Sequence, residues 1–262
     1  MAGSGITRRL GWIVVLAVGV VLFEIERRTL INTGNPNYVP SLILLGAAVV
    51  PASFVSFVYG RRLEYGVDAG TLLLIAVLGG VLGTVVAGVL EYKTLVTLGT
   101  LPMVAVALTE EASKLIVPLA VLALRRYRSV ADGLLVGVAS GAGFAALETM
   151  GYAFVVLIVS RGNIQAVDGV LLLRGVLSPA GHMAWTGLTC AGLWATAQAR
   201  WSGRSIAGFV AIFAVAVALH VAWDTVGTTI GYAVVGVFSL TALGVVTHRI
   251  AVQSRRLAAA IG

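Results

Sequence analysis

The chain has 262 residues, of which 59% are hydrophobic and only 11% are charged, and its mean hydropathy is +1.00. This composition excludes a soluble globular domain, because the exposed faces of such a domain need far more charge. The formal net charge of +7 does not indicate nucleic-acid binding, because the basic residues are distributed among the connections between long apolar segments. The sequence therefore predicts a polytopic membrane protein.

Apolar segments long enough to cross a bilayer recur along the whole chain. They predict about eight spans, at roughly 10–24, 40–59, 70–90, 99–124, 133–160, 178–199, 205–228 and 230–248. All should be α-helices, because lipid offers exposed backbone groups no hydrogen-bond partner. The expected fold is therefore an all-α transmembrane bundle that forms a single membrane domain over residues 1–262. Three peripheral spans lie in 1–98, a core lies at about 99–228, and the last span with a basic tail lies in 229–262.

Arginine and lysine are divided unequally between the two sides of this predicted bundle. Five lie on one side, namely Arg27, Arg28, Lys93, Arg161 and Arg174. Twelve lie on the other side, namely Arg8, Arg9, Arg61, Arg62, Arg125, Arg126, Arg128, Arg200, Arg204, Arg249, Arg255 and Arg256. Positive charge is retained in the cytoplasm during insertion, so both termini are predicted to be cytoplasmic.

Few ionisable residues lie well inside the predicted spans. Each costs at least about 2.5 kcal/mol on insertion scales, so each needs a partner, a water-filled cavity or a function. Seven such residues remain when the span ends are set aside: Glu110, Glu111, Lys114, Glu148, His182, His220 and Asp224. These seven are the candidate functional residues.

Helical spacing groups several of these side chains. Glu110 and Lys114 are four residues apart, so they share a helix face and could pair, whereas Glu111 is rotated by about 100°. His220 and Asp224 are also four apart, so the carboxylate could orient the imidazole. The spacing leaves open which of Glu110 and Glu111 meets the lysine and which one meets water.

The predicted topology gives each residue a depth, at about 1.5 Å of rise per residue. Measured from the outer end, Glu110 lies roughly 16 Å deep, Glu148 roughly 18 Å, His220 roughly 12 Å and Asp224 roughly 6 Å. His182 falls near the outer start of its span. Four helices could therefore bring their polar groups to one cavity that opens on the non-cytoplasmic side.

Small residues accompany these polar positions. Gly137, Gly141 and Gly143 occur in "GVASGAGFAALE", directly before Glu148, and predict close helix packing. Trp185 and Trp223 are expected to lie in the interfacial belt or to line the cavity.

Carboxylates and imidazoles gathered in an apolar cavity suit hydrolysis. Burial raises the pKa of a carboxylate toward the working range of a general base, and a nearby lysine or metal offsets that rise. His182 and His220 with Glu148 or Asp224 could also hold Zn²⁺, whose bound water becomes a nucleophile near neutral pH. No H-E-x-x-H motif is present, and Cys190 is the only cysteine, so the carboxylate interpretation is favoured over the metal interpretation.

Four segments together resemble the PrsW family of intramembrane proteases. They are "EEASK" from Glu110, "DGLLVGVASGAGFAALETMGYAF" from Asp132, "GHMAWTGL" from Gly181 and "LHVAWD" from Leu219. The family shows E-E-x-x-K, F-x-x-x-E, a lone histidine and H-x-x-x-[DN] in this order on successive helices. The resemblance covers about residues 108–226. The same superfamily contains the CAAX prenyl proteases and the APH-1 scaffold subunit.

The resemblance implies a bacterial cytoplasmic-membrane protease. It would cleave a membrane-anchored protein, typified by an anti-sigma factor, near the extracytoplasmic side. By the same resemblance, Glu110 corresponds to the glutamate that activates water. Glu148 occupies the position where the CAAX proteases have histidine, which leaves it as a second acid/base or a metal ligand.

The remaining motif positions carry over in the same way. His220 and Asp224 resemble the pair that binds the oxyanion or assists the water, and His182 resembles the additional histidine of the family. Glu111 and Lys114 resemble supporting residues. The sequence leaves open whether the protease is glutamic or metal-dependent, and it names neither the substrate nor the oligomeric state.

Two other functions are compatible with the same residues. A non-catalytic scaffold would keep the packing residues and tolerate the loss of Glu110. An ion-coupled transporter would use the carboxylates to carry protons, but the sequence shows no convincing inverted repeat and the polar residues are confined to one side.

Overall fold

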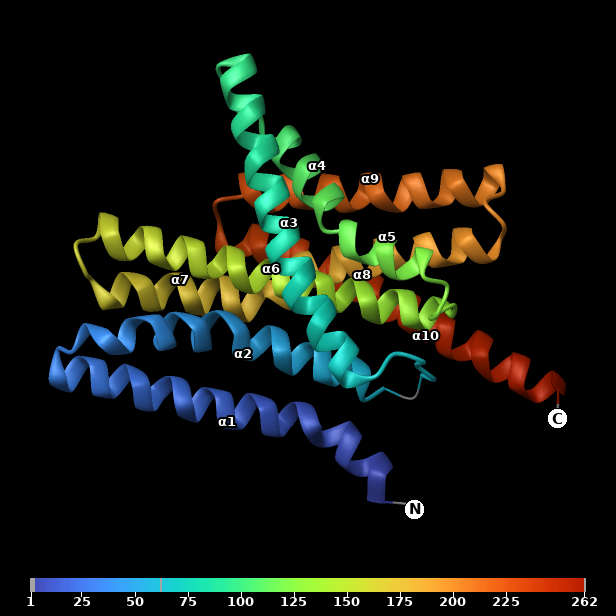
Figure 1. The fold of residues 1–262 in the computed structure, drawn as a ribbon, viewed down its shortest axis with the longest axis horizontal. Helices are drawn as coiled ribbons and strands as arrows, with labels where there is room; N and C mark the ends of the chain where they lie inside the picture. The colour runs from blue at the N-terminus through green and yellow to red at the C-terminus, as the bar shows by residue number, and fades with distance from the viewer. Residues whose placement is uncertain (1–2, 62, 262) are drawn as a thin grey trace. The chain divides into compact units, whose positions relative to one another are not determined.

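The computed structural model describes residues 3–61 and 63–261, and every regular element in this part of the chain is helical (Figure 1). Arg62 of the predicted cytoplasmic group and the two ends of the chain lie outside the described residues. The elements in order are α1 (Gly3–Thr33), η1 (Pro36–Tyr38), α2 (Val39–Tyr59), α3 (Ala69–Leu98), α4 (Met103–Ser113), α5 (Ile116–Ala123), α6 (Val130–Val159), α7 (Ile164–Leu177), η2 (Ser178–Ala180), α8 (His182–Gln198), α9 (Gly203–Thr225) and α10 (Thr229–Ile261). The all-α prediction is confirmed.

Among the described residues, five helices are long and apolar enough to cross a membrane by length and composition. They are α2 together with η1, α3, α6, α9 and α10. The other three predicted spans fall on α1, on α4 with α5, and on α8. The number of eight spans and the cytoplasmic position of both termini stay predictions.

The chain forms two compact units. The first comprises Met1–Arg61 and Ala145–Pro179, and the second comprises Arg62–Phe144 and Ala180–Gly262. Helix α6 is shared, because its first half belongs to the second unit and its second half to the first. The arrangement as one membrane domain with a core at about 99–228 stays a prediction.

Helices α1, α2, α7 and the second half of α6 form the first unit. Its buried core consists of Ile43, Ala47, Ala153, Val167 and Leu171. A polar contact ties α1 to α7, because Arg27 Nε donates to Asp168 Oδ2 at 2.7 Å. This unit is therefore held by an apolar core and by at least one partly buried ion pair.

Helix α6 is the packing centre of the second unit, and its glycines account for this. A Cβ atom on Gly141 would lie 2.6 Å from the carbonyl oxygen of His182, and one on Gly137 would collide with the carbonyl oxygen of Thr186. Helix α8 therefore lies directly on the α6 backbone. The prediction that these glycines permit close helix approach is confirmed.

The predicted span at 99–124 is not one continuous helix, because α4 ends at Ser113 and α5 begins at Ile116. Pro118 explains the break: it has no N–H for the carbonyl of Lys114, and its ring clashes with that carbonyl. Ser140 on α6 satisfies the same carbonyl instead, because its hydroxyl donates to it at 2.9 Å. The break thus leaves Lys114 at a turn that is fixed to α6.

Helix α3 crosses α6 at backbone contact. A Cβ atom on Gly143 would collide with the carbonyl oxygen of Ala76, and one on Gly80 would lie 2.7 Å from the Gly143 carbonyl carbon. We expect Gly143→Ala to destabilise the protein by at least about 2 kcal/mol, because the two backbones would have to separate. Thermal unfolding in detergent micelles measures this effect.

Gly88, also on α3, provides the matched control. A Cβ atom there would meet no atom within 4 Å. Gly88→Ala should therefore leave the melting temperature unchanged or raise it, because alanine is about 0.5–1 kcal/mol better than glycine in a helix. Equal destabilisation by both variants would contradict the assigned backbone crossing.

Candidate active site

Six of the predicted functional side chains meet in the second unit. Glu110 and Glu111 come from α4, and Lys114 from the turn that follows it. His182 is the first residue of α8, and His220 and Asp224 lie near the end of α9. Among them, all but Asp224 are buried, and Lys114 is completely inaccessible to solvent. The polar groups that the sequence distributes over more than 100 positions therefore form one cluster, here called the polar cluster.

Lys114 occupies the centre of the polar cluster. Its Nζ lies 2.7 Å from Glu111 Oε1 and 3.6 Å from Glu110 Oε2, so the nearer carboxylate is the one three residues away. The same Nζ lies 2.7 Å from His182 Nδ1 and 4.4 Å from the centre of the Phe144 ring. Lys114 therefore joins α4 to α8, and Glu111 is the carboxylate that it holds.

His220 is positioned by carboxylates on both sides of its ring. Its Nδ1 lies 2.8 Å from Glu111 Oε1. Its Nε2 lies 3.5 Å from Glu110 Oε2 and 3.3 Å from Asp224 Oδ2. Glu111 thus fixes the orientation of the ring, and the opposite nitrogen faces Glu110 and Asp224.

His182 lies beside the middle of α6. Its backbone is level with Gly141, the twelfth residue of α6. The reason is that α8 has only 17 residues and begins beside the middle of α6. An ammonium group only donates hydrogen bonds, so His182 Nδ1 accepts from Lys114 and the neutral ring carries its hydrogen on Nε2.

Aromatic rings enclose the two histidines. Trp185 is fully buried and stacks on His220 with 5.1 Å between ring centroids, while its Nε1 donates to Ser239 Oγ at 2.9 Å. His182 lies 5.5 Å from Phe144 and 5.1 Å from His220, centroid to centroid. Trp185 therefore lines the cluster, which is one of the two roles that the sequence leaves open for it.

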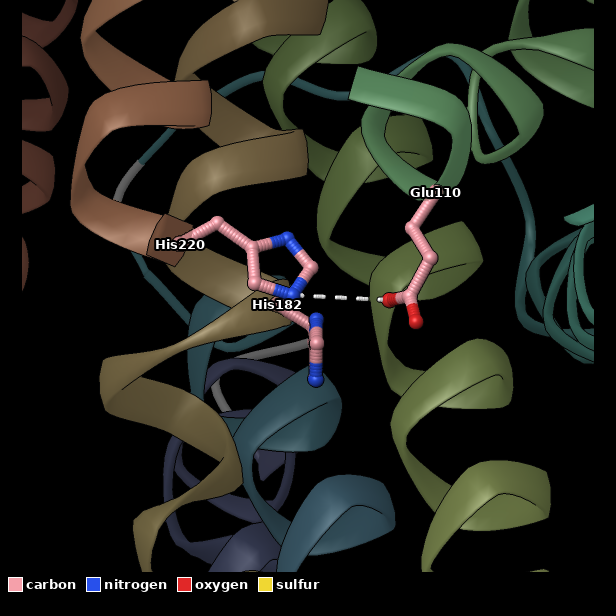
Figure 2. Close-up of side chains that lie close together, drawn as sticks. All are labelled: Glu110, His182 and His220. Atoms are coloured by element: carbon pink, nitrogen blue, oxygen red, sulfur yellow. Dashed lines mark ion pairs between the residues drawn. The ribbon is translucent and has the colours of Figure 1, made fainter. Parts of the chain in front are cut away.

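Figure 2 shows Glu110, His182 and His220 close together, with the ion pair between Glu110 and His220 drawn as a dashed line. One ligand atom from each of the three lies within 4.8 Å of the other two, and all three residues are buried. A carboxylate oxygen with two imidazole nitrogens is a ligand set found in catalytic zinc sites. The three residues are therefore a candidate metal centre.

Glu148 belongs to the first unit, on the second half of α6. Its Oε2 lies 2.7 Å from Arg174 Nη2 on α7, and the guanidinium of Arg174 lies 4.0 Å from the centre of the Tyr152 ring. Its assignment as a second acid/base or as a metal ligand stays a prediction. The ion-pair partner of Glu148 in this unit is Arg174, which the sequence identifies only as one of the five basic residues on one side.

Two contributors to the polar cluster are absent from the sequence-based set of candidates. Phe144 precedes Glu148 by four residues and packs against Lys114 and His182. Ser140 holds the carbonyl of Lys114. The sequence contains one signal for the contact of Ser140. Pro118, four residues after Lys114, leaves the Lys114 carbonyl without its helical hydrogen-bond donor, so another group has to donate to it.

Comparison with known proteins agrees with this arrangement. The model of the PrsW family of intramembrane metalloproteases matches residues 68–248, which is more than half of the chain and contains the whole polar cluster. No curated protein and no solved structure matches the chain. The chain belongs to the PrsW family of intramembrane metalloproteases.

Proposed function

We propose that this intramembrane protease hydrolyses a peptide bond in a membrane-anchored protein, with Glu110 as the general base for the attacking water. The observation that carries the proposal is the meeting of Glu110, His182 and His220 within 4.8 Å in a buried cluster. Burial excludes bulk water, and electrostatic interactions are strongest where bulk water is excluded.

Glu110 is the carboxylate suited to act on water. Glu111 accepts from Lys114 at 2.7 Å and contacts His220 at 2.8 Å, so its Oε1 is committed to two partners. Glu110 lies 3.6 Å from Lys114 and is the more accessible of the two, at 7% against 2%. A carboxylate in this position can take a proton from water as the water oxygen attacks the peptide carbonyl, and can return it to the leaving amine.

The imidazoles are suited to support the reacting carbonyl. With Lys114 donating to Nδ1, His182 offers an N–H at Nε2 to the oxygen on which negative charge develops. His220 is oriented by Glu111, and Asp224 at 3.3 Å supports its Nε2. The role of Glu148 as a second acid/base group stays a prediction from the sequence, because its ion-pair partner is Arg174 of the first unit.

The residues fit a divalent metal by donor type and by proximity. His182 and His220 would hold it, with Glu110 as the third ligand, and Glu111 would orient His220 through Nδ1, as carboxylates do at histidine ligands. A bound zinc ion supplies an activated water and polarises the substrate carbonyl. Since Nε2 of His182 carries a hydrogen while Lys114 donates to Nδ1, a metal ligand at Nε2 requires loss of that proton.

Measuring the metal content distinguishes the two proposed roles of His182, as a hydrogen-bond donor to the oxyanion and as a metal ligand. We expect purified, active protein to contain about one zinc per chain, and His182→Ala and His220→Ala each to lose it, because two neutral imidazoles are central to such a site. Glu110→Gln should keep the metal if Glu110 is the base alone, and should lose it if Glu110 is the third ligand. Active protein without metal would contradict the zinc assignment.

The proposed substrate is a single-span membrane protein such as an anti-sigma factor, cut near its extracytoplasmic side. The distribution of arginine supports this orientation, because it predicts cytoplasmic termini and a polar cluster in the outer half of the bundle. The protein would then be a multi-pass protein of a bacterial cytoplasmic membrane.

Co-reconstitution with single-span reporters tests the proposal. The purified protein should release a fragment from a membrane-anchored reporter, and mass spectrometry of the new termini should place the cut in the outer half of the reporter's span. A soluble peptide of the same sequence should be cleaved more slowly, because it lacks the membrane anchor. Absence of any cleavage by folded, metal-loaded protein across a reporter library would favour the scaffold function instead.

A further inference from the structure

A basic cavity of about 850 Å³ lies in the second unit, where α5 ends and α8 ends. Three arginines line it: Arg125 and Arg128 from the connection after α5, and Arg200 from the connection after α8. No aspartate or glutamate is among the described residues of its lining, and none of the three forms an ion pair within the part of the chain that the structure describes. The cavity therefore carries positive charge, and no carboxylate among its described lining residues neutralises that charge.

Hydrogen bonds hold the arginine-bearing connection in place. Trp194 Nε1 on α8 donates to the carbonyl oxygen of Tyr127 at 3.0 Å, and Gln198 Nε2 donates to that of Arg128 at 2.8 Å. Arg128 Nε in turn donates to the carbonyl oxygen of Arg125 at 2.9 Å. The connection is thus fixed to α8 at two points, so Arg125 and Arg128 are presented by a defined backbone and not by a free loop.

One wall of the cavity is apolar. Leu119, Leu122 and Ala123 of α5 line it, and Leu119 is 46% exposed on the outside of the helix. Trp201, which also lines the cavity, is 51% exposed. Exposed apolar side chains on a membrane protein contact lipid, and tryptophan is enriched at the membrane–water interface. The cavity is therefore basic in one part and continuous with a hydrocarbon-compatible surface in another.

We propose that this cavity binds an anionic phospholipid, with the headgroup phosphate between Arg125, Arg128 and Arg200 and an acyl chain along α5. Guanidinium groups bind phosphate through two parallel hydrogen bonds, and basic pockets between transmembrane helices suit anionic headgroups. Arginines that only set the membrane topology can lie anywhere in a cytoplasmic connection. That role does not require three of them to line one cavity with aromatic side chains and without carboxylates. The sequence predicts this end of the bundle to be cytoplasmic, the side on which anionic lipids attract basic segments.

Native mass spectrometry of the full-length, delipidated protein in detergent tests the assignment. Phosphatidylglycerol and phosphatidylcholine with identical acyl chains are titrated in parallel. We expect one phosphatidylglycerol to bind with about tenfold preference, and Arg125→Gln/Arg128→Gln/Arg200→Gln to abolish that preference. Arg125→Lys/Arg128→Lys/Arg200→Lys keeps the charge but cannot form the paired hydrogen bonds of a guanidinium, so it should retain a preference smaller than that of the parent. It also tests the proposal if the glutamine variant does not fold.

Three arginines of α10 provide a control with the same change of charge. Arg249→Gln/Arg255→Gln/Arg256→Gln removes three positive charges that the structure describes outside the cavity lining. It should bind phosphatidylglycerol as the parent does. Equal loss in both glutamine variants, or no preference in the parent, would overturn the proposal, because the effect would then come from net charge or be absent.

Inorganic phosphate distinguishes a lipid from a free anion. In large excess it should not displace phosphatidylglycerol, because it lacks the acyl chain that contacts α5. Displacement of the lipid by phosphate alone would assign the cavity to a soluble phosphate ligand and refute the lipid assignment.

Discussion

Glu110→Gln should slow the cleavage of a membrane-anchored reporter at least about a hundredfold, the lower end of the contribution of a positioned general base. Glutamine keeps the size of the side chain but cannot accept the proton of the attacking water. The melting temperature should change little, because the ammonium of Lys114 keeps its nearer partner Glu111 at 2.7 Å. The measurement is the initial rate of fragment release in liposomes, at equal protein and reporter.

Thr109→Val is a suitable matched control, since it changes the residue next to Glu110 on the same helix without altering any charge of the polar cluster. It should retain most of the activity. If Glu110→Gln cleaves as fast as the parent while Glu111→Gln does not, the base is Glu111 and the proposed assignment of the two carboxylates is reversed.

Glu111→Gln should have the largest effect on stability of the substitutions in the polar cluster. Lys114 is fully buried, and the change leaves its ammonium with the neutral His182 and with one carboxylate, that of Glu110 at the longer distance of 3.6 Å. Removing one partner of a buried ion pair costs about 3–5 kcal/mol, so the free energy of unfolding should fall by an amount of this order. Cleavage should fall as well, because Glu111 orients His220 through Nδ1.

The double variant Glu111→Gln/Lys114→Met separates the two effects. It removes the uncompensated charge together with its partner, so most of the lost stability should return. Cleavage should stay low, because the contact of Lys114 with His182 is then absent as well. A double variant as unstable as Glu111→Gln alone would show that the loss does not come from the unpaired lysine.

Much of the polar cluster could be predicted from the sequence because of the cost of burying charge. Glu110, His182, His220 and Asp224 are rare polar residues in apolar helices, so they had to meet partners, and the structure brings them together in one unit. The length of the apolar segments predicts the helices, because in lipid a helix satisfies its backbone hydrogen bonds within one segment.

Finer geometry depends on contacts that spacing does not encode. Residues three and four positions apart both lie near a helical side chain, so spacing cannot tell that Lys114 lies nearer to Glu111 than to Glu110. The position of His182 beside the middle of α6 follows from the short helix α8 and from the contact of Gly141 with its backbone. The depth of this histidine in the membrane stays a prediction.

The glycine crossing of α3 and α6 has a consequence for catalysis that extends beyond packing. Phe144, the neighbour of Gly143, touches Lys114, which in turn holds Glu111 and, through it, His220. A larger residue at this crossing would push the two backbones apart and shift these contacts, although the crossing itself contains no ionisable group. The geometry of the proposed active site thus depends on residues outside the polar cluster, including the backbone carbonyl of Ala76 on α3.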